Sequence, residues 1–547
     1  MSAIRQSYHR LRTGNLLHYR YTEADGPVIV LLHPSPMSSR FMAPLMRHLA
    51  PLGCVLAPDT PGYGYSDPLP NDDAGLAPYV SVLHEWIAAL ELAPLVLYGS
   101  ATGAQIAAEY AKAHPEQVAG LVLDNALHFE VEEREDLLEG YFPDRAVQPD
   151  GVHLLGHWCN MRNLSRYFPW HRESEATALP APAAPLDAVQ EQLVDQLLAG
   201  AGYARAYRAA FENEHLSNLV KVSVPTQVIC WQGSPVYRWM KPILEHGPWG
   251  EHVRISDCGP GLDERYALIF DACQGMARKL PARTVQRPDF AREMDRQGVA
   301  VSYGDGGGAS EEGENPALHW YGFKHSGESR RIVLLLHDLG ASAIGQFGPL
   351  LKDGGAGCYA VDLPGHGRSG AQGGIDLSGT ASAICDTLEE MGVTQVAVYG
   401  VGLGAAVGLA LSSAAAEGLS VSLNLVDAGG AVPLLPDLSP EEDGGHLLRL
   451  WDELLELRRK HPKPLSIARG GGPGEREVDL EAVQRQALDW LVVRQHLTAW
   501  QDILRDFDWD ARISGCRDIA ERISWRTPPT DDSGAVSRPL PQSENRP

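Results

Sequence analysis

The sequence predicts an α/β fold that is built twice along one chain, and three observations support this. Short apolar runs of strand length alternate with longer helical stretches, which is the pattern of a mostly parallel sheet flanked by helices. Sharp turns rich in small residues follow two of these runs, at residues 99–103 and 400–404. The landmarks of the first half then return in the same order with nearly one offset, so we expect a tandem duplication.

In copy one, residues 1–280, each element has its own signal. Residues 16–22 alternate as an edge strand, and residues 28–33 form a short apolar run after a Gly-Pro pair. Residues from about 130 to 215 are helical and rich in Trp, His and Arg, so they are expected to form an inserted helical cap. Further strands are expected at 54–57, 96–99, 118–123, 226–231 and 252–257, with helices at 41–49, 78–92, 105–114, 236–245 and 263–279.

Copy two is predicted at residues 316–510, after a Pro-, Gly- and Glu-rich segment at 281–315 that we interpret as a linker with a solvated hairpin tip. Its own cap is expected at about 435–508. After that cap no apolar strand matches 226–231 or 252–257, so copy two is predicted to be truncated. Residues 511–547 are predicted to be a disordered tail, because from Thr527 onward they are rich in Pro, Ser and charge.

Composition excludes several classes of protein. A chain of 547 residues is too long to fold around a single hydrophobic core, so at least two domains are expected. The net charge of −24 argues against nucleic acid or an anionic membrane as partner. No apolar run approaches the ~20 residues of a membrane span. Eight scattered cysteines without a C-x-x-C pair indicate a reducing compartment, so a cytoplasmic location is expected. The expected partner is a small-molecule substrate or ligand without a cofactor, and a homo-oligomer is left open.

The two small-residue turns occur in a recognisable series of motifs. In copy one, His33-Pro34 follows a strand, residues 59–67 read Asp-x-Pro-Gly-x-Gly-x-Ser-Asp, and residues 99–103 read Gly-Ser-Ala-Thr-Gly. In this order and spacing they resemble the α/β-hydrolase-fold superfamily, in the branch of haloalkane dehalogenases, epoxide hydrolases and esterases. The resemblance covers about 15–280 well and about 317–510 in part. It implies a nucleophile on the Gly-x-Ser-x-Gly elbow, a histidine, an orienting carboxylate and backbone N–H groups that hold an oxyanion.

All three side-chain positions of that machinery are vacant in copy one. The apex of the elbow is Ala101, which cannot attack a substrate. The usual place of the acid reads Gly-Ser-Pro-Val at 233–236, and the usual place of the histidine, 257–263, contains none. In copy two the apex is Gly402. A serine restored at the apex of copy one is therefore not expected to complete a triad.

Two side chains remain as catalytic candidates, each with a structural alternative. His33 begins the oxyanion loop and either faces the pocket or is buried against nearby backbone. Asp124 ends the strand after the elbow and either acts in the pocket or caps a helix. Their equivalents in copy two are His337 and Asp427, beside the vacant apex.

The substrate-binding candidates lie around the elbow and on the cap, and each also has a packing or capping alternative: Ser35, Ser100, Thr102, His153 and Trp158. His153 and His157 stand four apart on one predicted helix, a spacing that suits a metal, but no third ligand is in view and no metal is predicted. Two functions stay open. One is a hydrolase for a small carbonyl, ester or lactone-like substrate with a non-standard mechanism. The other is an inactive pseudo-hydrolase that binds a ligand or serves an interaction.

Overall fold

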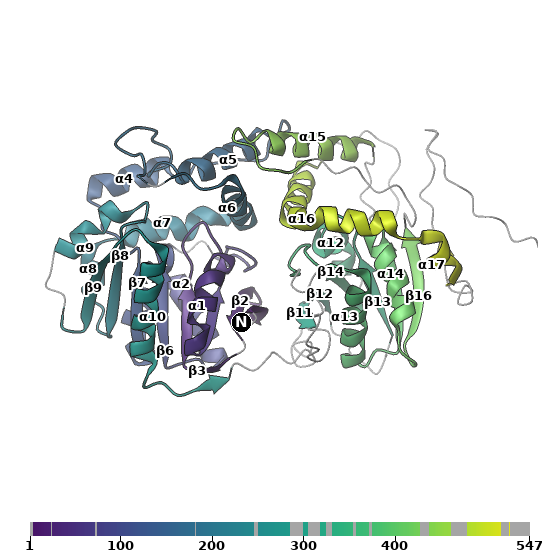
Figure 1. The fold of residues 1–547 in the computed structure, drawn as a ribbon, viewed down its shortest axis with the longest axis horizontal. Helices are drawn as coiled ribbons and strands as arrows, with labels where there is room; N and C mark the ends of the chain where they lie inside the picture. Colours follow the sequence, from purple (N-terminus) through teal and green to yellow (C-terminus); the bar gives the residue numbers. More distant parts are fainter. Residues whose placement is uncertain are drawn as a thin grey trace, which may run out of the picture.

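The computed structural model describes thirteen segments of the chain: residues 4–22, 24–71, 74–180, 182–245, 250–284, 299–304, 318–323, 331–353, 357–370, 375–426, 437–460, 479–515 and 524–525. Two α/β units follow one another, as the repeats predict (Figure 1). Among the described residues, no helix combines the length and apolar character needed to cross a membrane.

The sheet of copy one has eight strands in the order β1-β2-β5-β4-β6-β7-β8-β9. All neighbours from β5 to β9 are parallel, while β1 and β2 are antiparallel. The residues predicted as the edge strand are therefore covered by a further strand, β1. The bounds are β1 (Ile4–Arg10), β2 (Leu16–Thr22), β4 (Val28–Leu32), β5 (Cys54–Pro58), β6 (Leu95–Ser100), β7 (Val118–Asp124), β8 (Thr226–Trp231) and β9 (Val253–Cys258).

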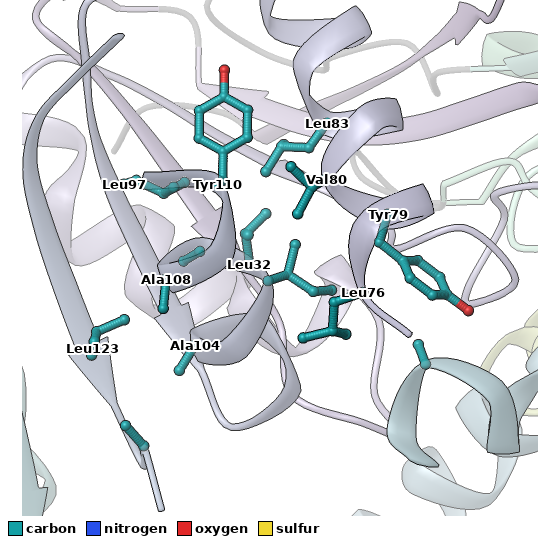
Figure 2. Close-up of a cluster of buried hydrophobic side chains, with 14 of the residues drawn as sticks. Leu32, Leu76, Tyr79, Val80, Leu83, Leu97, Ala104, Ala108, Tyr110 and Leu123 are labelled. Atoms are coloured by element: carbon teal, nitrogen blue, oxygen red, sulfur yellow. The ribbon is translucent and has the colours of Figure 1, made fainter. Parts of the chain in front are cut away.

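Helices cover both faces of this sheet because its central strands are apolar on both sides. Alternate residues separate the two faces: Leu32 and Leu97 pack toward α2 (Ala77–Ala89) and α3 (Thr102–Ala113), whereas Leu31 and Tyr98 pack toward α1 (Ala43–Leu49) and α10 (Leu262–Ala277). Figure 2 shows the first of these clusters, with Ala104 and Ala108 of α3 facing the strands. Between β7 and β8 lie the helices α4 (Val131–Gly140), α5 (Val152–Leu164), α6 (Leu186–Ala199), α7 (Tyr203–Asn213) and α8 (Leu216–Leu219), here called the cap helices of copy one.

The sheet of copy two has seven strands in the order β11-β12-β14-β13-β15-β16-β17. Their bounds are β11 (Val299–Gly304), β12 (Leu318–Phe323), β13 (Arg331–Leu336), β14 (Cys358–Asp362), β15 (Gln395–Val401), β16 (Ser420–Val426) and β17 (Ser524–Trp525). Its helices are α12 (Ala343–Asp353), α13 (Leu377–Glu390), α14 (Leu403–Ala414), and the cap helices α15 (Gly445–Lys460) and α16 (Leu480–Asp506), followed by α17 (Trp509–Gly515).

Two expectations about copy two can now be refined. The segment interpreted as a linker with a hairpin tip contains β11, which pairs antiparallel with β12, and the short strand β10 (Arg283–Thr284), which pairs with β3 (Asp25–Gly26) of copy one. The end of the chain was predicted to lack apolar strands that match 226–231 and 252–257; the two-residue strand β17 takes the place of β8 beside β16, and no described strand takes the place of β9. A two-residue strand carries no periodicity, so the sequence pattern could not reveal it. Copy two is nevertheless the smaller unit, as predicted.

The two copies meet through reciprocal contacts of their caps, which lie side by side in Figure 1. His153 on α5 bonds Gln484 on α16 at 2.8 Å, and the equivalent His446 on α15 bonds Gln190 on α6 at 2.9 Å. The indole of Trp158 donates to the Glu442 carbonyl, and that of Trp451 donates to the Pro149 carbonyl. The same pair of equivalent positions thus makes the contact in both directions. Such a surface is isologous, as in a two-fold dimer. The duplicated chain therefore folds as an intramolecular pseudo-dimer.

Candidate functional site

The two elbows have the same backbone geometry. Ala101 has φ 48° and ψ −114°, and Gly402 has φ 49° and ψ −108°. Small residues flank each apex for a steric reason. A Cβ on Gly99 would overlap the Gly103 carbonyl, and a Cβ on Gly103 would overlap the carbonyl of Leu32. Each elbow therefore lifts its apex residue to the carboxyl end of the sheet, although neither apex carries a nucleophile.

In copy two the elbow already holds an anionic group. Asp338 follows His337 at the end of β13, and its Oδ1 accepts a hydrogen bond from Leu339 N at 2.7 Å and from Leu403 N at 3.0 Å. Leu403 is the residue after the apex, and Leu339 lies in the loop after β13. The N–H groups at these two positions form the oxyanion hole of this fold. A Cβ on Gly402 would overlap the same oxygen. The side chain of Asp338 thus closes the site of copy two.

The equivalent N–H groups of copy one belong to Ser35 and Thr102. Pro34 replaces Asp338, and Ala101 replaces Gly402, so copy one has no carboxylate at this place. Among the described residues, neither the Ser35 N–H nor the Thr102 N–H has an acceptor. The pair is here called the open cradle. Two N–H donors at the positions that in copy two share one carboxylate oxygen suit a carbonyl or carboxylate oxygen of a ligand.

Asp124, the predicted acid candidate, is held in a buried ion pair. Arg265 on α10 donates to its Oδ2 from Nε at 2.8 Å and from Nη2 at 2.6 Å, and the Tyr98 hydroxyl donates to the same oxygen at 2.7 Å. Asp124 is fully buried, and its charge, with the hydrogen bonds, raises the pKa of Arg265 against the effect of burial. The carboxylate faces the side of the sheet that α1 and α10 cover, and Arg265 neutralises its charge there. Asp124 therefore has a structural role.

His33 is likewise occupied by backbone. Thr60 N donates to its Nε2 at 2.9 Å, so the proton is on Nδ1, which donates to the Pro34 carbonyl at 3.0 Å. Burial lowers the pKa of His33. His337 repeats the arrangement, with Leu363 N at 2.8 Å and the Asp338 carbonyl at 2.8 Å. Both imidazoles tie the oxyanion loop to the turn after the next strand and keep no ring nitrogen for proton transfer.

The same turn is braced by the aspartate of the Asp-x-Pro-Gly motif. Asp59 accepts from Ser39 N at 2.6 Å and from Tyr65 N at 2.9 Å, and it pairs with His18 at 2.7 Å. The hydrogen bonds and the nearby histidines lower the pKa of Asp59 despite its burial. In copy two Asp362 bonds the corresponding amides. The motif therefore fixes the loop that carries the cradle.

Aromatic side chains occupy the space between the cap helices and the sheet of copy one. The Ser35 hydroxyl donates to Tyr63 OH at 2.9 Å, and Tyr63 OH donates to the Tyr203 carbonyl on the cap. Tyr141 and Tyr207 bond through their hydroxyls at 3.0 Å. The four tyrosines belong to one buried hydrophobic cluster, and Ser35 beside them is also buried. This packing connects the oxyanion loop to the cap, and the Ser35 side chain has a structural role in it.

The other predicted site residues are spread over different places. Ser100 is buried and accepts from Asn125 Nδ2 at 3.4 Å, while the buried Thr102 hydroxyl has no hydrogen-bond partner among the described residues. His153 and Trp158, candidates for substrate binding with packing in the cap as the alternative, bond copy two in the junction. Asp427 lies outside the described residues. Among those residues no group of three metal-ligating side chains comes together.

Three residues that shape the site were missed from the sequence. Asp338 had a signal, since it replaces the proline of His33-Pro34, but its contact with the elbow is long-range. Arg265 lies on a helix with no motif. Glu214 follows α7, is fully buried, and its Oε2 has no hydrogen-bond partner among the described residues. Burial raises the pKa of Glu214 well above its ordinary value.

Comparison with known proteins agrees with this geometry. A family model described as "alpha/beta hydrolase fold" matches residues 27–230, and one described as "Alpha/beta hydrolase family" matches residues 333–536. The chain belongs to the α/β-hydrolase family. It carries this family's domain twice, and the two matches together span most of the sequence.

Curated relatives of this α/β-hydrolase protein match it over short segments. A haloalkane dehalogenase from Mesorhizobium japonicum is 32% identical over 105 residues, which are 19% of this chain and 34% of the relative. An uncharacterized hydrolase from Saccharomyces cerevisiae is 29% identical over 137 residues, which are 24% of this chain and 46% of the relative. The chain thus spans less than half the length of either relative.

Solved structures similar to this α/β-hydrolase protein include an epoxide hydrolase from Vigna radiata and an esterase from Exiguobacterium antarcticum. The first is 18% identical, covers 51% of this chain and 98% of its own, and has a TM-score of 0.40. The second is 17% identical, covers 49% and 98%, and has a TM-score of 0.36.

Proposed function

We propose that this α/β-hydrolase-family protein is a non-catalytic ligand-binding protein, in which copy one recognises a small molecule through a carbonyl or carboxylate oxygen. The observation that carries the proposal is the contrast between the two elbows. In copy two Asp338 occupies the converging N–H groups, whereas in copy one the open cradle of Ser35 and Thr102 has no acceptor among the described residues. Recognition survives without chemistry because Ala101 cannot attack and Asp124 is paired with Arg265.

The test transfers the closure of copy two into copy one. The double variant Pro34→Asp/Ala101→Gly supplies the carboxylate and the room that it needs, and Pro34→Ala/Ala101→Gly is the matched control without the carboxylate. Acetate, butyrate and benzoate are the probes, with binding measured by calorimetry on the full chain. We expect saturable binding to the native protein and the control and none to the Asp-containing variant. Equal binding to both variants, or none to the native protein, would refute the proposal.

A second candidate is a hydrolase with a non-standard mechanism for a small ester or lactone-like substrate. Glu214 favours it. Its carboxyl group is buried beside the cap tyrosines, its Oε2 has no hydrogen-bond partner among the described residues, and burial raises its pKa, so it is a candidate acid or base. Turnover of p-nitrophenyl butyrate by the native protein that disappears in Glu214→Gln would favour this function. Absence of turnover leaves the binding function.

A further inference from the structure

A cavity opens where α16 of copy two reaches copy one, here called the junction pocket. It is an open pocket of about 330 Å³, a volume that includes open solvent at its mouth. Its wall combines β2, the loop after β4, the turn after β5, and α6 of copy one with α16 of copy two. Three guanidinium groups line it, those of Arg20, Arg40 and Arg494.

Two of the three arginines are neutralised by carboxylates of α6. Arg40 pairs with Glu191 and, at 3.1 Å, with Asp195. Arg494 pairs with Glu191 across the junction, and Gln495 donates to the same carboxylate at 2.9 Å. Glu191 is therefore saturated by groups from both copies, and the two arginines lower its pKa.

Arg20 is the third arginine, and no carboxylate of the described residues pairs with it. Its Nε is buried without a hydrogen-bond partner, and Arg20 forms no ion pair within the described part of the chain. A guanidinium group cannot lose its charge in a protein and carries five donors. Such a group in a half-buried wall is costly unless an anion compensates it. The missing partner is expected to enter from the pocket.

The surplus of positive charge is local. The whole chain has a net charge of −24, so its overall field repels anions. The pocket is lined by three arginines and by one carboxyl group, that of Asp195, whose pKa is raised by burial. Arg368 of copy two lies over the ring of Tyr65, 5.6 Å from its centroid.

We propose that the junction pocket binds a compact oxyanion of the phosphate class, either free or on a small phosphomonoester, with Arg20 as the principal contact and Arg40 and Arg494 beside it. The planar fork of a guanidinium group matches two oxygens of such an anion. Because Arg494 belongs to copy two, the bound anion braces the two copies against each other. This site is separate from the open cradle and does not depend on the proposed function.

The experiment measures thermal unfolding and calorimetric binding of the full chain with inorganic phosphate, glycerol phosphate and acetate, against sodium chloride at equal ionic strength. Arg20→Gln removes the unpaired charge, and Arg254→Gln, an exposed arginine on β9 of the sheet's far edge, is the matched control. We expect phosphate to raise the melting temperature of the native protein and of Arg254→Gln. Its affinity is expected to fall at least tenfold in Arg20→Gln.

Arg20→Gln breaks no ion pair of the described residues. In the absence of phosphate the variant is therefore expected to melt no lower than the native protein. Stronger binding of glycerol phosphate than of phosphate would identify a phosphomonoester as the ligand, and the reverse would identify the free ion. Equal phosphate affinity in Arg20→Gln and Arg254→Gln, an effect that sodium chloride reproduces, or tighter binding of acetate would overturn the proposal.

Discussion

Asp338 and Gly402 share one space: the Oδ1 of Asp338 lies where a side chain at the apex of the second elbow would begin, and a Cβ on Gly402 would overlap it. In copy one the same two positions hold Pro34 and Ala101. The copy with the carboxylate has glycine at the apex, and the copy without it has the larger alanine. The two substitutions are physically coupled.

This coupling is measurable as a double-mutant cycle. Gly402→Ala is expected to destabilise the protein by about 2 kcal/mol or more, through overlap with Asp338 rather than through the backbone, because Ala101 adopts the same φ in copy one. Asp338→Ala alone costs about 1–3 kcal/mol by leaving two N–H groups without an acceptor. The double variant is expected to be about as stable as Asp338→Ala in thermal unfolding. Additive losses would contradict the shared space.

Restoring a nucleophile is expected to give no enzyme. Ala101→Ser places a hydroxyl at the apex of copy one, but Asp124 is bound to Arg265, and both nitrogens of His33 are bonded to backbone. No base is then available to take the hydroxyl proton. The measurement is labelling by a fluorophosphonate and hydrolysis of p-nitrophenyl butyrate, with the native protein as control. Labelling of the variant alone would show that a base was overlooked.

The ion pair of Asp124 and Arg265 is expected to support the fold. Arg265→Met leaves a fully buried carboxylate without its cation and should cost about 3–5 kcal/mol. Adding Asp124→Asn removes the stranded charge and should recover part of that loss. Urea unfolding of the two variants and the native protein measures both effects. If Arg265→Met is as stable as the native protein, the pair has no structural role.

Asp489 on α16 should make copy two less stable as the pH rises. It is half-buried and accepts a hydrogen bond from Ser342 at 3.1 Å, and desolvation raises its pKa to about 7. Between its ordinary pKa of 3.8 and 7 the folded state keeps the proton that the unfolded chain has released, so stability falls over this range as pH rises. Asp489→Asn should therefore stabilise by about 2 kcal/mol more at pH 8 than at pH 5.5. Asp506→Asn, an exposed carboxylate of the same helix, is the control and should show no such difference.

The cap junction should weaken in acid. Burial lowers the pKa of His446 to about 4 and also lowers that of His153. In each imidazole Nδ1 accepts a backbone N–H, so protonation breaks that bond. The unfolded chain takes the proton first as the pH falls below 6.5, and the stabilisation is lost between about 6.5 and 4. Replacing both histidines by glutamine should flatten this part of the pH dependence of the melting temperature. An unchanged slope would show that the junction does not titrate.

Much of the fold could be predicted from the sequence because its signals are local. The strand-to-helix turns at Ala101 and Gly402 require small flanking residues, and the duplicated motifs required a second sheet. The strands β1, β11 and β17 were not predicted, because a strand at the edge of a sheet is held by pairing rather than by an apolar pattern.

The site was less predictable because its decisive contacts are distant in sequence. Asp124 and Arg265 are 141 residues apart, and only the topology brings α10 beside β7. His153 and Trp158 were candidates either for substrate binding or for packing, because they lie on the cap. Their side chains bond copy two instead, and the sequence of a cap helix does not tell which of its faces meets its own domain.

The isologous junction has a consequence for how the two elbows could diverge. In a dimer of identical chains every substitution appears on both sides of the axis, so closing one binding site would close the other. Covalent linkage removes that constraint while it keeps the reciprocal cap contacts. One half of the molecule can therefore hold its own aspartate at the elbow while the other keeps two N–H groups without an acceptor among the described residues, an asymmetry that no pair of identical subunits could encode.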